Sequence, residues 1–461
     1  MPASTKMIIA LMIEPKTPLN RPLAEKVVNN GVPPVLFYFV LLIFLSSTII
    51  LCGDDEKVAD VDMSQTWSMK RFYILVFVVC ITGSTQGLLI PLLTTFLEER
   101  GVSADVNGLS AAALYVGIMI ASPLCAWMVG RYGYKKMILL GLSITTVAVG
   151  LIPLFTNIWV WSALRFTVGI GDSFLHYATQ LWITSTALPN ERGKRISQYG
   201  FFYGLGFGIG PLGLNLLSLG EHVPLWTMFA LLVVTIGLAM QLKEDQEKVT
   251  SEKREEKAAK HHVAVVYRIG LVALCPALLY GFLEASLAGN FPVIGLRDGI
   301  SKGWISVLIS AFVWGSLVFQ IPLGILGDKI GRKRLLMAVC ALGAIGMFLI
   351  PHLMPNAWAL FVAFSLIGGL IGSIFSLGLA YVTDLLPSQY LPTANMIASV
   401  HFSLGSMLGP YMGGLLIKGW GGHALFYLIS ASLAAFVLLA LVYRHAEASE
   451  SSLPVQEKQI G

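Results

Sequence analysis

Twelve apolar segments, each about 20 residues long, constrain the fold of this chain more than any other feature of its sequence. Each is long enough to cross the hydrocarbon core of a bilayer, which is about 30 Å thick. Lipid offers the backbone no hydrogen-bond partner, so such segments fold as helices, which bond internally. Only 12% of the 461 residues are charged, about half the share in a soluble domain. The sequence therefore predicts an all-α integral membrane protein with twelve transmembrane helices. The segments lie near residues 72–97, 107–129, 137–155, 158–187, 197–219, 224–242, 267–291, 303–326, 335–353, 357–386, 393–417 and 422–443.

The twelve segments form two sets of six that resemble each other. Residues 101–103 (Gly-Val-Ser) and 299–301 (Gly-Ile-Ser) match at a spacing of 198 positions. A polar stretch of mixed charge, residues 243–262, separates the sets and is typical of a solvated linker. We therefore expect two parallel six-helix repeats. The expected parts are an N-terminal extension at 1–68, an N-terminal bundle at 69–242, a cytoplasmic linker at 243–266, a C-terminal bundle at 267–443 and a cytoplasmic tail at 444–461.

Lys and Arg residues are distributed unevenly between the two sides of the predicted bundle. Cytoplasmic loops carry an excess of these residues. From residue 70 onward, 21 of them fall in segments on the side of the loop after span 2, and four fall in segments on the other side. The sequence thus predicts that both ends of the twelve-span core are cytoplasmic. The four basic residues on the predicted outer side are Arg100, Arg297, Lys302 and Lys418.

Residues 1–68 do not fit this arrangement. They contain one more apolar run, residues 35–52, which is followed by three acidic residues. If that run crossed the membrane with its basic flank inside, every later loop would be inverted against the Lys and Arg distribution. Met69, which precedes a Lys-Arg pair, resembles a natural start. We expect residues 1–68 to be a mis-annotated upstream stretch or a dispensable extension. The alternative is an additional helix with an outside N-terminus.

The sequence argues against several classes of function. Its five cysteines are scattered through apolar runs without a CxxC pair, so we interpret them as core residues and expect no metal site. No P-loop is present, which excludes an ATP-driven pump. A membrane enzyme would need a clustered catalytic set, which the sequence lacks. We therefore expect a protein that is not an enzyme and needs no cofactor.

A charged loop recurs after the second span of each set. The second copy reads Gly324-x-x-x-Asp328-Lys329-x-Gly331-Arg332-Lys333. The first copy has Ala126 and Gly130 in place of Gly324 and Asp328, and keeps Arg131, Gly133, Lys135 and Lys136. In this pattern, residues 70–443 resemble the major facilitator superfamily, which places the motif after span 2 and repeats it at span 8. The resemblance implies a transporter whose spans 1, 4, 7 and 10 line a central cavity.

The repeated loop has the chemistry of a gate latch. Asp328 lies where it can face the positive N-terminal end of a neighbouring helix, and Gly331 permits a tight turn. We predict that the latch favours the state closed to the inside. We expect it to be weaker in the first half, where Gly130 replaces the acid. The alternative is that the loop is a topology signal alone.

A second motif is repeated in spans 5 and 11. It resembles the antiporter motif of the drug:proton exporters, the bacterial twelve-span branch of the superfamily. Glycines four positions apart let helices approach closely, and proline bends a span. The alternative is ordinary packing of small residues. The motif residues are Gly206, Gly210 and Pro211 in span 5, and Gly405, Gly409, Pro410, Gly413 and Gly414 in span 11.

Span 4 carries the most unusual polar set. Arg165, Gly169, Asp172 and His176 are spaced so that they share one helix face. Intramembrane charge is costly and is expected to face a cavity or a partner. We expect Arg165 to hold a nearby carboxylate ionised and Asp172 to carry protons; the alternative is a structural Arg–Asp pair. His176 is either a relay or a hydrogen-bonded buried histidine.

Span 7 contains the other membrane carboxyl group, Glu284, whose counterpart 198 positions earlier is Gln86 in span 1. Burial disfavours the charged form of a carboxyl group, so Glu284 is a second candidate proton carrier. Its alternative role is neutral packing. Gln86 is a candidate cavity residue, and Asp384, near the inner end of span 10, is interpreted as an interfacial acid.

These observations favour a proton-coupled exporter that exchanges protons for small amphipathic or cationic compounds by alternating access. The alternative is a proton-coupled importer of a small polar nutrient, and a remote one is a non-transporting membrane sensor, which would need a soluble output domain. We expect a multi-pass protein of the plasma membrane that acts as a monomer. Its expected partners are the lipid bilayer and a small-molecule substrate, with no nucleic acid.

Overall fold

The structure is a computed structural model that describes residues 63–186, 192–243, 263–354 and 356–443. All regular secondary structure in these ranges is helical, which confirms the all-α prediction. The first half contains α4 (Met63–Glu99), α5 (Ala104–Tyr132), α6 (Tyr134–Leu151), η1 (Ile152–Leu154), α7 (Ile158–Thr186), α8 (Arg192–Ile209), η2 (Gly210–Ser218) and α9 (Val223–Met240). The second half contains α11 (Val263–Arg297), α12 (Lys302–Ile330), α13 (Arg332–Leu353), α14 (Ala357–Gly372), α15 (Ile374–Leu385), η4 (Ser388–Tyr390), α16 (Leu391–Trp420) and α17 (Ala424–Val442).

Over the described ranges these helices make twelve spans. The helix α8 continues into the 3-10 helix η2 to form the fifth span, and α14 and α15 together form the tenth. By length and composition, ten of the described spans are apolar enough to cross a membrane, and α7 and α16 fall short. The polar residues Arg165, Asp172 and His176 lower the mean hydropathy of α7.

The expected boundaries shift slightly at two helices. α4 begins at Met63, within the expected N-terminal extension, and α11 begins at Val263, within the expected linker. The rest of the extension, linker and tail, residues 1–62, 244–262 and 444–461, lies outside the described residues.

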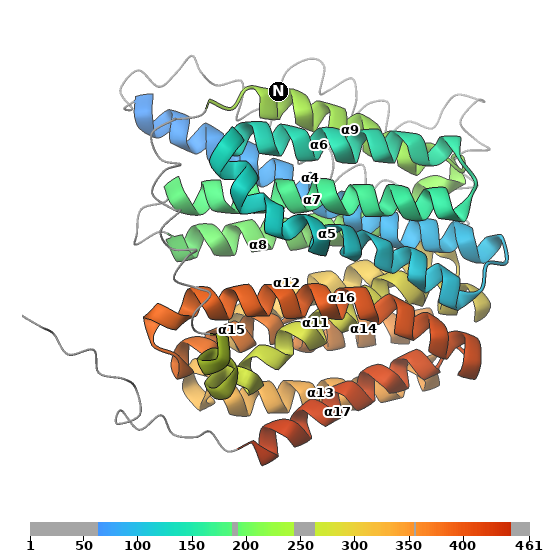
Figure 1. Ribbon diagram of the computed structural model, residues 1–461. Helices are drawn as coiled ribbons and strands as arrows, with labels where there is room; N and C mark the ends of the chain where they lie inside the picture. The colour runs from blue at the N-terminus through green and yellow to red at the C-terminus, as the bar shows by residue number, and fades with distance from the viewer. Residues whose placement is uncertain (1–62, 187–191, 244–262, 355, 444–461) are drawn as a thin grey trace, which may run out of the picture.

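Figure 1 shows the two halves as stacked layers, with α4 to α9 in blue and green above α11 to α17 in yellow to red. Each half builds its own apolar core. Leu142 and Trp161 are buried in the core of the first half, and Phe291 and Phe426 in that of the second. Apolar side chains also pack across the boundary between the halves, where Ile209, Leu212 and Leu216 of the first half contact Val307 and Trp314 of α12.

The two repeats also match in backbone geometry. Gly101, between α4 and α5, has a φ of +72°, and Gly299, between α11 and α12, has a φ of +77°. Gly133 and Gly331, in the turns after spans 2 and 8, have φ values of +85° and +92°. Residues with a Cβ atom rarely adopt these values, so the turns require glycine in both copies.

The bundle has two ends, named here from the distribution of Lys and Arg in the sequence. The predicted outer end holds the turns that join α4 to α5 and α11 to α12. The predicted inner end holds the turns that join α5 to α6 and α12 to α13, which contain the two copies of the charged loop.

Candidate transport site

A hydrogen-bonded network surrounds Asp172, whose side chain is completely buried in α7. Gln86 of α4 donates from Nε2 to Asp172 Oδ2 at 2.9 Å, and Thr145 of α6 donates to Asp172 Oδ1 at 3.5 Å. The hydroxyl of Tyr203, in α8, donates to Gln86 Oε1 at 2.9 Å. Four helices therefore contribute to one buried polar cluster, and Gln86 fixes the position of the Asp172 carboxyl group.

His176 lies one helical turn from Asp172, toward the predicted inner end. Its Nδ1 is 2.7 Å from the hydroxyl of Tyr199, and its ring meets that of Tyr203 edge-on, with the centroids 4.9 Å apart. The other ring nitrogen, Nε2, is buried and has no hydrogen-bond partner in the described part of the chain. Of the two roles considered for His176, that of a hydrogen-bonded buried histidine describes its contact with Tyr199.

Arg165 does not hold a carboxylate, contrary to the expectation from the sequence. Its side chain is 1% exposed, and it donates to Ser110 Oγ at 2.9 Å and to the Ile90 carbonyl oxygen at 3.2 Å. Among the described residues it has no ion-pair partner, and its Nε is unbonded. The reason is distance along the helix: Asp172 is seven residues away, about 10 Å along the axis. Both side chains nevertheless approach α4, so the predicted shared face is confirmed for this pair.

Gly169, the small member of the span-4 set, lets α7 contact α5. A Cβ atom at this position would lie 2.0 Å from the Leu114 carbonyl oxygen. A contact that short excludes any side chain, so Gly169 has a packing role.

Glu284 occupies the position in α11 that corresponds to Gln86 in α4. Its side chain is half-buried and accepts a hydrogen bond of 3.0 Å from the hydroxyl of Tyr280, one turn earlier. The helices that carry Gln86 and Glu284, α4 and α11, pack against each other across the boundary between the halves. The two carboxyl groups, one from each half, therefore belong to the same central region.

Sequence reasoning missed the tyrosines that partner these groups. Tyr199 and Tyr203 lie in an aromatic-rich stretch of span 5. The available signal was their spacing of four residues, which puts both on one face of α8. That face meets α7 and α4, which only the helix packing reveals.

The motif glycines of spans 5 and 11 lie at helix contacts within each half. A Cβ atom on Gly206 would lie 2.0 Å from the Cys80 carbonyl oxygen of α4, and one on Gly405 would lie 2.1 Å from the Leu278 carbonyl oxygen of α11. The close approach predicted for these glycines is thus confirmed. The next motif glycines continue the same contacts: Gly210 packs on Ser84, Gly409 on Phe282, and Gly413 on Asn290.

The motif prolines and the last glycine act differently. Pro211 lies in the first turn of η2, where the α-helical geometry of α8 ends. Pro410 stays inside α16, and its carbonyl oxygen accepts a hydrogen bond of 3.1 Å from Asn290. Gly414 faces the other half, since a Cβ atom there would lie 2.3 Å from the Ala104 carbonyl oxygen of α5.

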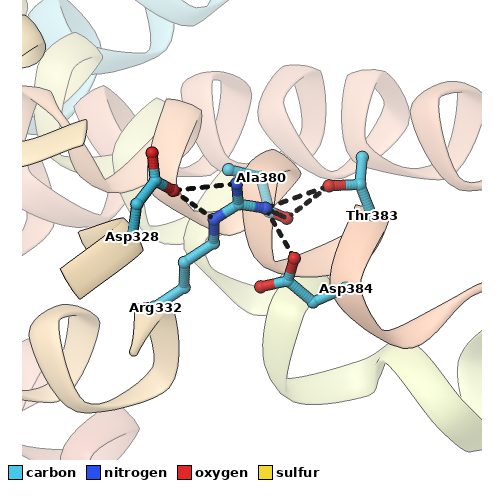
Figure 2. Close-up of polar contacts among 5 residues, drawn as sticks. All are labelled: Asp328, Arg332, Ala380, Thr383 and Asp384. Carbon is cyan, nitrogen blue, oxygen red and sulfur yellow. Dashed lines mark hydrogen bonds and ion pairs between the residues drawn. The ribbon is translucent and has the colours of Figure 1, made fainter. Parts of the chain in front are cut away.

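The second copy of the charged loop is centred on Arg332 (Figure 2). Arg332 bonds Asp328 Oδ1 at 3.0 Å and Asp384 Oδ1 at 2.8 Å, and it also bonds Thr383 and the carbonyl oxygen of Ala380. Arg332 is the first residue of α13, so the Asp328 carboxylate lies at the N-terminal end of that helix and pairs there with the Arg332 side chain. Asp328 pairs with the guanidinium group four residues later because that group lies between it and the C-terminal end of α15, where cations are favoured.

Other residues of the two loops occupy simpler positions. Lys329 is exposed at the end of α12. Arg131, in the first copy, lies over the rings of Trp127 and Tyr132, 5.6 and 5.7 Å from their centroids. Asp384 is half-exposed, which fits an interfacial acid.

One lysine contact recurs in both loops. Lys135 donates to the Met240 carbonyl oxygen at 2.7 Å, and Lys333, 198 positions later, donates to the Tyr443 carbonyl oxygen at 3.1 Å. Each lysine thus binds the C-terminal end of the last helix of its own half, where a positive charge is stabilising.

Comparison with known proteins places this architecture in a family. The sequence model of the Major Facilitator Superfamily matches residues 75–306 and 273–461. This chain belongs to the Major Facilitator Superfamily. It is therefore a secondary transporter of the membrane, and like other members of this superfamily it is not an enzyme and needs no cofactor.

Relatives and solved structures agree with that membership. The chain is 38% identical over 380 residues to the uncharacterised MFS-type transporter YfkF of Bacillus subtilis (strain 168), covering 81% of this chain and 95% of the relative. It is 23% identical over 367 residues to the uncharacterised MFS-type transporter YcaD of Salmonella heidelberg (strain SL476), covering 78% and 90%.

Two solved transporters share the fold. A mutant of the nucleoside transporter NupG aligns with a TM-score of 0.68 and 11% identity, covering 80% of this chain and 99% of that one. The D-xylose-proton symporter aligns with a TM-score of 0.67 and 13% identity, covering 82% and 98%.

Proposed function

We propose that this chain is a proton-coupled antiporter that exports small amphipathic or cationic compounds. The observation that carries the proposal is the pair of intramembrane carboxyl groups, Asp172 and Glu284, one from each half. Ionisable groups within a membrane are costly and typically mark proton or substrate pathways. A group that alternates between a neutral and an anionic form is what exchange of a proton for a cation requires.

The surroundings of the two carboxyl groups suit this exchange. In the ionised state, Asp172 keeps the donors Gln86 and Thr145, which stabilise its charge, whereas Tyr280 is the one donor to Glu284 among the residues that the structure describes. Glu284 is also the less buried of the two, so we assign to it direct competition between proton and substrate. The ring of Tyr280, whose hydroxyl bonds Glu284, offers a face to which an organic cation is attracted.

The antiporter-type motif supports export. Its span-11 copy is complete from Gly405 to Gly414, and its glycines make the close helix contacts that the motif implies. We assign the protein to the plasma membrane as a multi-pass monomer, with both ends of the twelve-span core in the cytoplasm. The Lys and Arg distribution supports this orientation, and the assigned partners remain lipid and a small-molecule substrate, without nucleic acid.

A second candidate is proton-coupled import of a small polar nutrient. The solved structures that resemble this chain include a nucleoside transporter and a D-xylose-proton symporter. The cluster of Gln86, Asp172 and Tyr203 would supply hydrogen bonds to a polar substrate. In the export proposal, proton entry drives amphipathic cations out of the cell. In the import proposal, proton entry drives a polar nutrient into the cell.

Transport in proteoliposomes with an imposed pH gradient separates the two candidates. The probes are ethidium, an amphipathic cation, and uridine and D-xylose, two polar nutrients. Proton-driven movement of ethidium against its gradient, lost in Glu284→Gln, is the expected result. Proton-driven accumulation of uridine or xylose without ethidium transport would replace export by import. Ethidium transport that is unchanged in Glu284→Gln would remove Glu284 from the proposal.

A further inference from the structure

The four basic residues of the predicted outer end all have acidic partners. Arg100 pairs with Glu221 of its own half at 3.3 Å. The other three bases lie in the second half and pair with acids of the first half. These pairs are Arg297 with Glu98, Lys302 with Glu99, and Lys418 with Asp105.

The geometry of the three pairs is tight. Arg297 binds both oxygens of Glu98, from Nε at 2.7 Å and from Nη2 at 3.1 Å. Lys302 Nζ lies 2.5 Å from Glu99, and Lys418 Nζ lies 2.7 Å from Asp105. The acids Glu98 and Asp105 are only 14% and 18% exposed, so solvent screens these charges less than those of a free surface pair.

The backbones of the two halves meet directly beneath the ion pairs. A Cβ atom on Gly108 of α5 would lie 2.1 Å from the Pro410 carbonyl oxygen of α16. Gly414 makes the corresponding contact with Ala104, one residue from Asp105. The ion pairs therefore border a packed contact between halves, which alternating access requires to separate.

The repeats carry opposite charges at equivalent positions of this end. The spacing of 198 residues that aligns Gly101 with Gly299 also aligns Glu99 with Arg297 and Arg100 with Asp298. If the two loops carried the same charge at equivalent positions, they would place like charges opposite each other across the boundary and would repel. Reversal of the charges converts that repulsion into attraction.

We propose that these three ion pairs form an outer latch, made of Glu98, Glu99, Asp105, Arg297, Lys302 and Lys418. The latch holds the outer end closed and breaks each time the transporter opens to that side. The latch shifts the equilibrium between the outer-closed and outer-open conformations. This effect does not depend on the substrate, so the inference goes beyond the export function proposed above. It also accounts for basic residues that the orientation rule treats as exceptions.

The test measures distances between spin labels by pulsed electron paramagnetic resonance. Labels are attached to cysteines at two exposed positions of the outer end, Leu219 in the first half and Trp420 in the second, in a background without the five native cysteines. In the unmodified latch the short distance should dominate. Glu98→Gln should raise the ratio of long to short distances about two- to fivefold, the range for one partly exposed pair. Glu98→Gln combined with Glu99→Gln and Asp105→Asn should raise it more than about tenfold.

Arg100→Gln is the matched control, because it removes a pair of the same end that does not cross the halves. It should leave the distance distribution unchanged. An unchanged distribution in the triple variant would overturn the proposal, and so would an Arg100→Gln shift as large as that of Glu98→Gln.

A charge swap guards against variants that fail through misfolding. Glu98→Arg alone and Arg297→Glu alone should each open the end, and the two together should restore the short distance. Failure of the swap to restore it, with both single variants opening, would also contradict the latch. These distances are measured without substrate or pH gradient, so they remain decisive even where ethidium export fails.

Discussion

The two halves of this transporter place different chemistry on the same backbone positions. At the centre, the first half has Gln86 where the second has Glu284. Gln86 serves as a fixed donor and acceptor between Tyr203 and Asp172. Glu284 is half-buried and, within the described part of the chain, has one hydrogen-bond donor, Tyr280. One repeat thus contributes a preorganised network and the other a carboxyl group with greater freedom to exchange a proton.

The charged loops diverge in a similar way. Arg332 bonds the Ala380 carbonyl oxygen in the second half, and the equivalent pair in the first half is Tyr134 and Trp182, whose rings stack 5.6 Å apart. Both pairs attach the loop to the inner end of the fourth span of their half. The two halves therefore share the position of this contact, but the contact is polar in the second half and aromatic in the first.

The largest expected effect tests what the halves share. Gly206→Val should abolish accumulation of folded protein, because its Cβ atom would meet the Cys80 carbonyl oxygen at 2.0 Å and force α8 away from α4. Gly405→Val should do the same in the second half. Gly200→Ala is the control, since nothing lies within 4 Å of a Cβ atom there. Yield and thermal stability in detergent measure the effect, and a stable Gly206→Val protein would contradict it.

The next prediction tests the difference at the centre. Glu284→Gln should abolish the component of ethidium transport that the pH gradient drives, because an amide at this position does not titrate. Gln86→Glu in the same background asks whether a carboxyl group on the other half can replace it. We expect no rescue, because residue 86 is committed to Asp172 and Tyr203. Restored coupling would make the halves interchangeable at this position.

Asp172→Asn should reduce proton-driven transport strongly, with a smaller effect on folding than on coupling. Asparagine keeps hydrogen-bonding capacity toward Gln86 and Thr145 but does not exchange a proton. Thr145→Val is the matched control, because it removes the long 3.5 Å contact and leaves the carboxyl group. Equal loss in both variants would indicate a structural role for Asp172, which transport and melting temperature measured together would reveal.

Asp328→Asn should impair transport clearly while changing stability by less than about 1 kcal/mol, as expected for an exposed ion pair. The side chain of Asp328 is 65% exposed, and Arg332 keeps Asp384 as its other partner. Transport rate and melting temperature are compared with those of Lys329→Gln, an exposed charge in the same loop. Normal transport in Asp328→Asn would reduce the loop to a topology marker.

The smallest effect is expected for Gly130→Asp, which restores the missing acid of the first loop. The structure sharpens this expectation, because the position equivalent to Arg332 is Tyr134. An acid at 130 therefore has no guanidinium partner four residues later, and the single change should slow cycling only slightly. Gly130→Asp with Tyr134→Arg should slow it more. A large effect of the single change would show that the acid acts without its arginine.

The helices, the repeats and the family were predictable from local sequence. Hydrophobic length specifies a span, and glycine at a positive φ specifies a turn, so Gly133 and Gly331 marked both loops correctly. Buried carboxyl groups were equally visible, because Asp172 and Glu284 interrupt apolar runs. Each of these features depends on neighbours in the chain.

Tertiary structure alone decided which groups meet. Arg165 bonds Ser110 and a backbone carbonyl instead of a carboxylate, and Arg332 bonds Asp384, 52 residues later in the chain. The sequence by itself determined that charged residues lie within the membrane, because they interrupt apolar runs that are long enough to span it. Their partners depend on which helices cross at that depth and at what rotation, and that is a property of the packed bundle.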